Sequence, residues 1–229
     1  MWKEILAIFN KDTLLDQAYK KSYEMLDITY QMYQEARSSL REREDNKLAE
    51  HIYGQDIAVN KFEREVRRKV LSHLAVSGTT DLYSGLVLVS IIIDVERIGD
   101  YTKNIIEIAQ NHPPRLHGGL YEEDLLKVEN AVEDVFIRVR EIFEKAEAKK
   151  ASQLLEEYQW INKLCDQHAI DYLNERDKTI SSGDAVALSL YFRFLKRINS
   201  HLRNIATSVV NPFDKIGFYR RKDDIKSKR

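Results

Sequence analysis

The sequence predicts an all-α protein made of two tandem antiparallel three-helix bundles that are related by an internal repeat. The 229 residues include only three prolines, at 113, 114 and 212, and they leave two long proline-free halves of similar length. Glycine is also scarce, with eight residues. Since proline and glycine are the usual breaks between short elements, this distribution favours long helices with one central interruption.

The stretch from 81 to 109 shows the helical pattern most clearly. It reads DLYSGLVLVSIIIDVERIGDYTKNIIEIA, and at about 100° per residue one side carries Val87, Ile91, Ile98 and Ile105. The opposite side begins with Leu82, Leu86, Val89 and Ile93. A buried strand also suits the run LVLVSIII, but the pattern continues far beyond the usual strand length of about 5–6 residues. The apolar run is also shorter than the roughly 18–20 residues that a bilayer requires.

The remaining helices follow from the same spacing of apolar residues, at every third or fourth position. In the first half we expect helices at about 13–44, 46–76 and 81–109. In the second half we expect them at about 121–148, 151–180 and 185–210. HPPRLHGG, at 112–119, is the clearest break in the chain. The predicted organisation is therefore a first bundle at 1–112, a linker at 113–120, a second bundle at 121–211 and a basic tail at 212–229.

Composition excludes several classes of protein. Lysine and arginine total 36 against 37 acidic residues, so the overall charge gives no reason to expect a nucleic-acid partner. A single cysteine, Cys165, excludes an intramolecular disulfide, and its place beside apolar Leu164 in a helical pattern suggests an inert thiol. The amino terminus, MWKEILAIF, lacks the basic start and long apolar run of a signal peptide, which predicts a cytoplasmic protein. Its short amphipathic pattern allows packing on the bundle or peripheral membrane association.

The polar side of the helix near 90 carries a candidate cation site. Glu96 and Asp100 lie four residues apart, so their carboxylates project the same way from one helix face, followed by Asn104. Asp56 and Asn60 form a second pair with this spacing in the preceding helix. Carboxylate oxygens are the ligands that hard cations prefer. The same pattern also describes the wet face of any amphipathic helix, and spacing alone leaves that interpretation open.

The internal repeat becomes visible when the helix near 90 is aligned with the helix near 190 at an offset of one hundred residues. Leu88, Arg97, Ile98 and Ile105 then meet identical residues, whereas Glu96 meets Lys196 and Asp100 meets Ser200. Aligning Asn60 with Asp171 places Gln167 opposite Asp56. A lysine repels a cation, so a metal site is expected in the first bundle only. His201 is the one substitute ligand that the second bundle offers.

The segment DVERIGDYTKNI closely resembles the signature helix of the PhoU family, cytoplasmic regulators of bacterial and archaeal phosphate uptake. The resemblance extends to the two tandem bundles, to the D-x-x-x-N segment from Asp56 to Asn60, and to Asp81 and Leu82. It implies that Glu96, Asp100 and Asp56 ligate a surface metal centre, of iron, zinc or a similar cation, with Asn60 as a weaker neutral contributor. The second bundle departs from the signature at KRINSHLRNI, which puts a second metal centre in doubt.

The resemblance also implies a function. It predicts a non-enzymatic, metal-binding adaptor that relays phosphate status between a membrane phosphate transporter and a sensor kinase. The transporter type, ATP-driven or sodium-coupled, stays open, and a homodimer is compatible with this role.

Two rival interpretations belong to other classes of protein. A carboxylate-bridged dimetal enzyme in a helical bundle draws on Glu-x-x-His pairs, and no histidine of this chain has a glutamate three residues before it. A metal-free helical scaffold that only binds partners is the other alternative. In a scaffold of that kind, replacing both Glu96 and Asp100 by alanine leaves partner binding unchanged.

Overall fold

The computed structural model describes residues 12–42, 47–112 and 115–218, and within these ranges it contains helices and no strands. The long helices are α2 (Leu14–Arg41), α3 (Lys47–Ser77), α4 (Leu82–Asn111), α5 (Glu122–Lys145), α6 (Ala148–Glu157), α7 (Trp160–Leu173) and α8 (Ser182–Val210). Two short 3-10 turns, η1 (Gly119–Tyr121) and η2 (Phe213–Lys215), complete them. The all-α prediction is confirmed. The amphipathic start predicted at 1–11 and the end of the basic tail lie outside the described residues.

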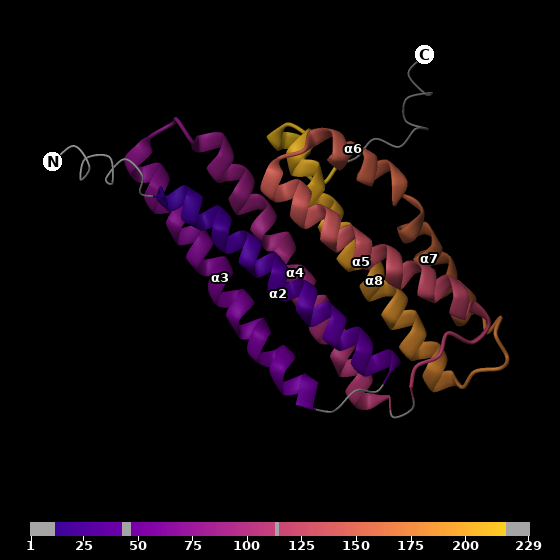
Figure 1. The fold of residues 1–229 in the computed structure, drawn as a ribbon. Helices are drawn as coiled ribbons and strands as arrows, with labels where there is room; N and C mark the ends of the chain where they lie inside the picture. Colours follow the sequence, from indigo (N-terminus) through magenta and orange to yellow (C-terminus); the bar gives the residue numbers. More distant parts are fainter. Residues whose placement is uncertain (1–11, 43–46, 113–114, 219–229) are drawn as a thin grey trace, which may run out of the picture.

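The two halves of the chain lie side by side along their length (Figure 1). Helices α2, α3 and α4 pack on one another in the first half, and α5 to α8 form the second half around α8. The halves meet chiefly through α4 and α8, which run antiparallel. His201 contacts Asp94, and His112 at the far end of α4 contacts Asp184 at the start of α8. Both halves therefore share one continuous hydrophobic core.

Helix α4 has the two sides that its sequence predicts. Ile91, Ile98 and Ile105 are fully buried in the core. On the opposite side Leu86 and Ile93 each keep 40% of their surface exposed. This outer side continues toward Glu96 and Asp100, so the fold leaves the predicted polar face of α4 at the surface.

The helix predicted at 151–180 is wrong in its extent, because the chain forms two helices there, α6 and α7. The break falls at Tyr158 and Gln159, and the helical pattern ends at Leu173. The carbonyl of Leu155, near the end of α6, accepts a hydrogen bond from the buried guanidinium of Arg203 on α8 (3.0 Å). Burying such a carbonyl without a donor is costly, so this contact helps to stabilise the interruption.

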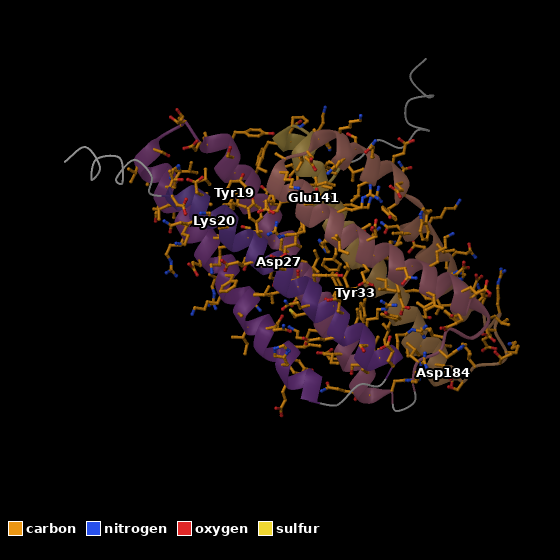
Figure 2. The ribbon with its side chains drawn as sticks, in the orientation of Figure 1. Tyr19, Lys20, Asp27, Tyr33, Glu141 and Asp184 are labelled. Atoms are coloured by element: carbon orange, nitrogen blue, oxygen red, sulfur yellow. The ribbon has the colours of Figure 1, made fainter. Side chains whose placement is uncertain are left out.

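A buried charge network joins the two halves through α2, α5 and α8. Glu129 of α5 is fully buried and lies 3.0 Å from the Nε of Arg41 on α2. Tyr191 of α8 donates a hydrogen bond to the same carboxylate (2.7 Å). Tyr33, which lies between α2 and α5 in Figure 2, donates to the Glu129 carbonyl. Burial raises the pKa of Glu129, and the positive charge of Arg41 acts in the opposite direction.

Replacing Arg41 by methionine removes the cation but keeps much of the side chain's volume. Because Glu129 then stays buried without its nearest positive charge, we expect the free energy of unfolding to fall by about 3–5 kcal/mol. Lys20→Ala is the control, since the Lys20 side chain is 61% exposed in its pair with Asp12 and such pairs contribute about 0–1 kcal/mol. Urea denaturation followed by circular dichroism measures both. A loss in Arg41→Met no larger than in the control contradicts the proposed role of the network.

Candidate functional site

The structure brings the four predicted site residues together on the outer side of the first half. Asp56 and Asn60 come from α3, and Glu96 and Asp100 come from α4. The Asn60 amide donates to the backbone carbonyl of Asp56 (3.0 Å) and more weakly to its carboxylate (3.4 Å). We refer to Asp56, Asn60, Glu96 and Asp100 as the acidic cluster. It lies where two adjacent antiparallel helices present polar faces to the same patch of surface.

A lysine side chain lies between the two helices at this cluster. The ammonium of Lys103 is 3.0 Å from Oδ2 of Asp56 and 3.3 Å from Oδ1 of Asp100. Lys103 is three residues beyond Asp100, so both side chains leave α4 on neighbouring positions of one face. Burial disfavours the ammonium, but the hydrogen bonds and charges of Asp56 and Asp100 raise the pKa of Lys103 overall. A positive charge of the chain itself therefore bridges α3 and α4.

Arg97 neutralises the remaining part of the cluster. Its guanidinium lies 3.3 Å from Oδ2 of Asp100 and 3.5 Å from Oε2 of Glu96. Burial, followed by the nearby carboxylate of Asp100, raises the pKa of Glu96. Three carboxylates thus share two cations, Lys103 and Arg97, and each of the three contacts at least one of them.

This arrangement does not fit a metal ion. Among the described residues, no three His, Cys, Asp or Glu side chains lie close enough together to form a ligand set. Asp56 and Asp100 face an ammonium, and Asn60 turns its amide NH₂ toward Asp56. A divalent cation needs several oxygen ligands and is repelled by a fixed positive charge. The metal site predicted at Glu96, Asp100, Asp56 and Asn60 thus stays a prediction, and the side-chain geometry does not favour it.

The equivalent region of the second half is also bridged by a lysine. Lys196 of α8, the counterpart of Glu96, contacts both carboxylate oxygens of Asp166 on α7 (2.6 and 2.7 Å). Ser200, the counterpart of Asp100, accepts a hydrogen bond from Asn162 (2.9 Å). The second half therefore has polar contacts between α7 and α8 but no acidic pair on α8.

The sequence alignment of α3 with α7 is wrong in register. It places Gln167 opposite Asp56 and Asp171 opposite Asn60, whereas the residue of α7 that contacts Ser200 is Asn162. Asp171 lies further along α7 and contacts the guanidinium of Arg176 (3.2 Å). The apolar residues of α7 repeat so regularly that several alignments with α3 fit equally well. The break between α6 and α7 also interrupts the pattern that would otherwise fix the alignment.

His201, the substitute ligand considered for the second half, has a different place. Its Nδ1 lies 2.7 Å from Oδ1 of Asp94 on α4, and its ring stacks on Tyr101 with centroids 5.7 Å apart. The Asn204 amide donates to the same Asp94 oxygen (3.0 Å). His201 thus belongs to the contact between the two halves.

Two glycines of α4 differ in what surrounds them. A Cβ built at Gly99, between Glu96 and Asp100, would lie 3.5 Å from Val59, which is an ordinary contact. A Cβ at Gly85 would lie 3.0 Å from Leu74 and 3.1 Å from Val70. A side chain at 85 would therefore need Leu74 and Val70 of α3 to shift, whereas one at 99 would meet only ordinary contacts.

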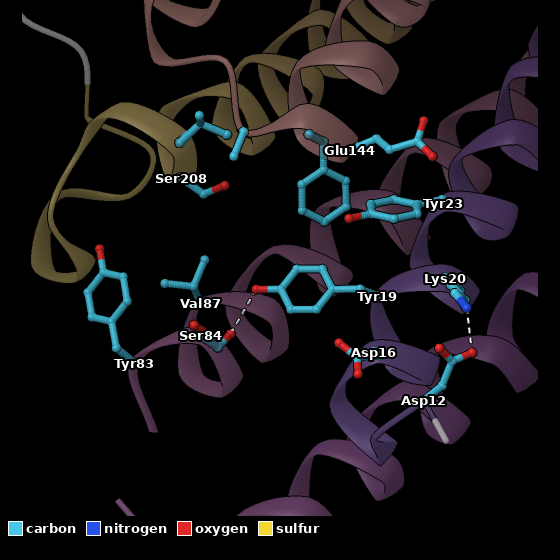
Figure 3. Close-up of a pocket in the computed structure, with 13 residues that line it drawn as sticks. Asp12, Asp16, Tyr19, Lys20, Tyr23, Tyr83, Ser84, Val87, Glu144 and Ser208 are labelled. Carbon is cyan, nitrogen blue, oxygen red and sulfur yellow. Dashed lines mark hydrogen bonds and ion pairs between the residues drawn. The ribbon is translucent and has the colours of Figure 1, made fainter. Parts of the chain in front are cut away.

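Two hollows lie apart from the acidic cluster. The first, of about 610 Å³, opens where α2, α4, α5 and α8 come together (Figure 3). Tyr19 lies in it and donates a hydrogen bond to the carbonyl of Ser84 (3.2 Å), and burial raises the pKa of Tyr19 to about 12. The second, of about 820 Å³, is a mainly apolar groove between the end of α4 and the start of α8, lined by Ile108, Val186 and Leu190 among others.

Comparisons with known proteins agree with the resemblance seen in the signature helix. The family model described as PhoU domain matches residues 23–109, which include all four residues of the acidic cluster. A phosphate-specific transport system accessory protein PhoU homolog of Xylella fastidiosa is 28% identical over 192 residues, covering 77% of this chain and 75% of that protein. Residues 23–109 of this chain are therefore a PhoU domain.

Other proteins extend the comparison. An uncharacterized protein of Methanocaldococcus jannaschii is 32% identical over 134 residues, which are 58% of this chain and 40% of that protein. The crystal structure of PhoU from Pseudomonas aeruginosa superposes with a TM-score of 0.72 at 19% identity, covering 86% of this chain and 95% of that one. The phosphate transport system regulatory protein PhoU from Streptococcus pneumoniae gives 0.73 at 18%, covering 85% and 92%. These structures establish a shared PhoU fold.

Sequence reasoning identified the acids of this PhoU domain but missed the role of Lys103. The sequence did indicate one of its contacts, because a lysine three residues after an aspartate on a helix can form an ion pair with it. The contact to Asp56 depends on how α3 packs against α4, which the spacing along one helix does not reveal. Lys103 nevertheless supplies one of the two positive charges at the site and is the one that contacts α3.

The two glycines of α4 give a matched test of this packing. Gly99→Ala should raise the free energy of unfolding by about 0.5–1 kcal/mol, because alanine favours the helix and meets only ordinary contacts. Gly85→Ala gains the same propensity but forces Leu74 and Val70 to move, at a cost of about 1–3 kcal/mol. Thermal unfolding of the two variants measures the difference. Equal effects at both positions would show that α3 does not approach α4 as closely as described.

Proposed function

We propose that this chain is a non-catalytic accessory protein that regulates a phosphate transport system. The observation that carries the proposal is the PhoU-domain match over residues 23–109, together with the similarity to a phosphate-specific transport accessory protein across most of the chain. The solved structures that share the fold support it, since one of them is a phosphate transport system regulatory protein.

The surroundings of Cys165 and of the acidic cluster, the side chains best suited to catalysis, support a binding role. Cys165 is buried, and burial raises the pKa of its thiol to about 12, so its nucleophilic thiolate is disfavoured at neutral pH. The carboxylates of the acidic cluster contact Lys103 and Arg97. Regulation by contact with other proteins needs neither a nucleophile nor a general acid.

The proposed partners are a membrane phosphate transporter and its sensor kinase, met on the cytoplasmic side. Across the described residues, every helix is too short or too polar to cross a bilayer. In this proposal the chain meets the transporter as a peripheral partner. A metal-loaded form, which the resemblance to the family implies, requires Lys103 to withdraw from Asp56 and Asp100. The proposed regulation does not depend on it.

Deleting the gene tests the proposal in the cell. We expect uptake of radiolabelled phosphate in phosphate-rich medium to rise severalfold, because the transport system loses the protein that restrains it when phosphate is plentiful. A plasmid copy of the wild-type chain should restore the restraint, and a copy carrying Lys20→Ala, an exposed change, should restore it equally well. Affinity purification of the tagged chain from detergent-solubilised membranes should recover transporter subunits.

Unchanged uptake in the deletion strain at both high and low phosphate would contradict the proposal. Restored uptake control without transporter or kinase recovery would instead support regulation through a different partner. A helical scaffold unrelated to phosphate predicts neither effect.

A further inference from the structure

The position of Lys103 distinguishes this acidic cluster from a set of metal ligands. Its side chain is 24% exposed, between Asp56 at 12% and Asp100 at 30%. The ammonium has three hydrogens, and two of them are directed to carboxylates that come from different helices. Hydrogen bonds between ionised partners are shorter and stronger than neutral ones. Lys103 thus contacts the carboxylates of Asp56 on α3 and Asp100 on α4, as a bound cation would.

Four of the six carboxylate oxygens of Asp56, Glu96 and Asp100 already contact the chain's own cations. One oxygen of Asp56 and one of Asp100 contact Lys103, and the second oxygen of Asp100 contacts Arg97. One oxygen of Glu96 also contacts Arg97. A divalent ion would have to break these ion pairs and would still meet the nearby positive charges. The balance of charge therefore favours the chain without a metal.

The second half supplies an independent observation. Lys196 bridges α8 to Asp166 of α7, two neighbouring helices of the second half. Lys103 does the same for α4 and Asp56 of α3 in the first half. The lysines sit at different positions of the repeat, yet each links two neighbouring helices of its own half. In both halves a lysine thus forms an ion pair between two helices.

We propose that Lys103 is the resident cation of the acidic cluster, so that this PhoU-domain protein holds α3 and α4 together there without a metal ion. The proposal concerns only the first half's cluster and is independent of whether the chain regulates phosphate transport. It assigns Lys103 a structural role that the acids alone do not reveal. Removing the lysine should convert the cluster into a cation site.

Equilibrium dialysis of the full-length chain against Zn²⁺ and Mn²⁺, with elemental analysis, tests the proposal. The wild-type protein should bind these ions weakly, and Lys103→Met should bind them about tenfold more tightly or better, because one repelling charge is gone and two carboxylates are free. Lys103→Arg keeps the charge and should stay weak. Lys69→Met, a change on α3 at a side chain of similar exposure (23%), should also stay weak.

Further variants test whether the metal that Lys103→Met binds lies at the acidic cluster. Adding Glu96→Gln and Asp100→Asn to Lys103→Met should abolish the gain, which assigns the ion to the cluster. Circular dichroism shows whether each variant folds, and Lys103→Gln replaces the methionine variant if that one does not. Tight stoichiometric binding by the wild type that Glu96→Gln and Asp100→Asn remove would overturn the proposal. So would an unchanged affinity in folded Lys103→Met or Lys103→Gln. These readouts use purified protein, so they fail or succeed separately from the uptake experiment.

Discussion

The arrangement of the two halves depends on the ion pair and the hydrogen bond that the buried carboxylate of Glu129 makes. This carboxylate sits in the core on α5, and one of its oxygens is contacted by Arg41 from α2 and by Tyr191 from α8. A buried charge without such partners is strongly unfavourable, so α2, α5 and α8 must meet in one register. With α2 and α5 packed on one side of α4 and α8, the opposite side of α4 stays at the surface. Glu96 and Asp100 therefore stay partly exposed, whereas Asp56 on α3 is buried.

The same principle recurs at the surface, where the chain balances its acids with its own cations. Asp56 and Asp100 share Lys103, and Asp166 pairs with Lys196 in the other half. In each case a lysine joins two helices that belong to one half. The acids that a signature motif singles out as metal ligands are, in this chain, part of a set of ion pairs between helices. The identity of the residue one turn beyond Asp100 is therefore as informative as the acids.

Much of the fold follows from the sequence, because a helix of α4's length needs an unbroken apolar pattern and that pattern is visible without a structure. The buried line from Ile91 to Ile105 and the exposed Leu86 and Ile93 lie on the predicted sides. The break between α6 and α7 is invisible in sequence, since no proline or glycine marks it and the Leu155 carbonyl is satisfied by Arg203 from far along the chain. The four site residues were found from their spacing, but the bridging role of Lys103 depends on packing between helices.

The PhoU domain and the solved structures establish the fold, and the side chains decide what the acidic cluster does. The most direct test of the central claim is a crystal structure of the wild-type protein grown with excess Zn²⁺ and recorded at the zinc absorption edge. We expect the Lys103 ammonium at hydrogen-bond distance from both Asp56 and Asp100, with no anomalous signal beside them. A zinc peak held by Asp56, Glu96 and Asp100, with Lys103 turned away, would contradict it.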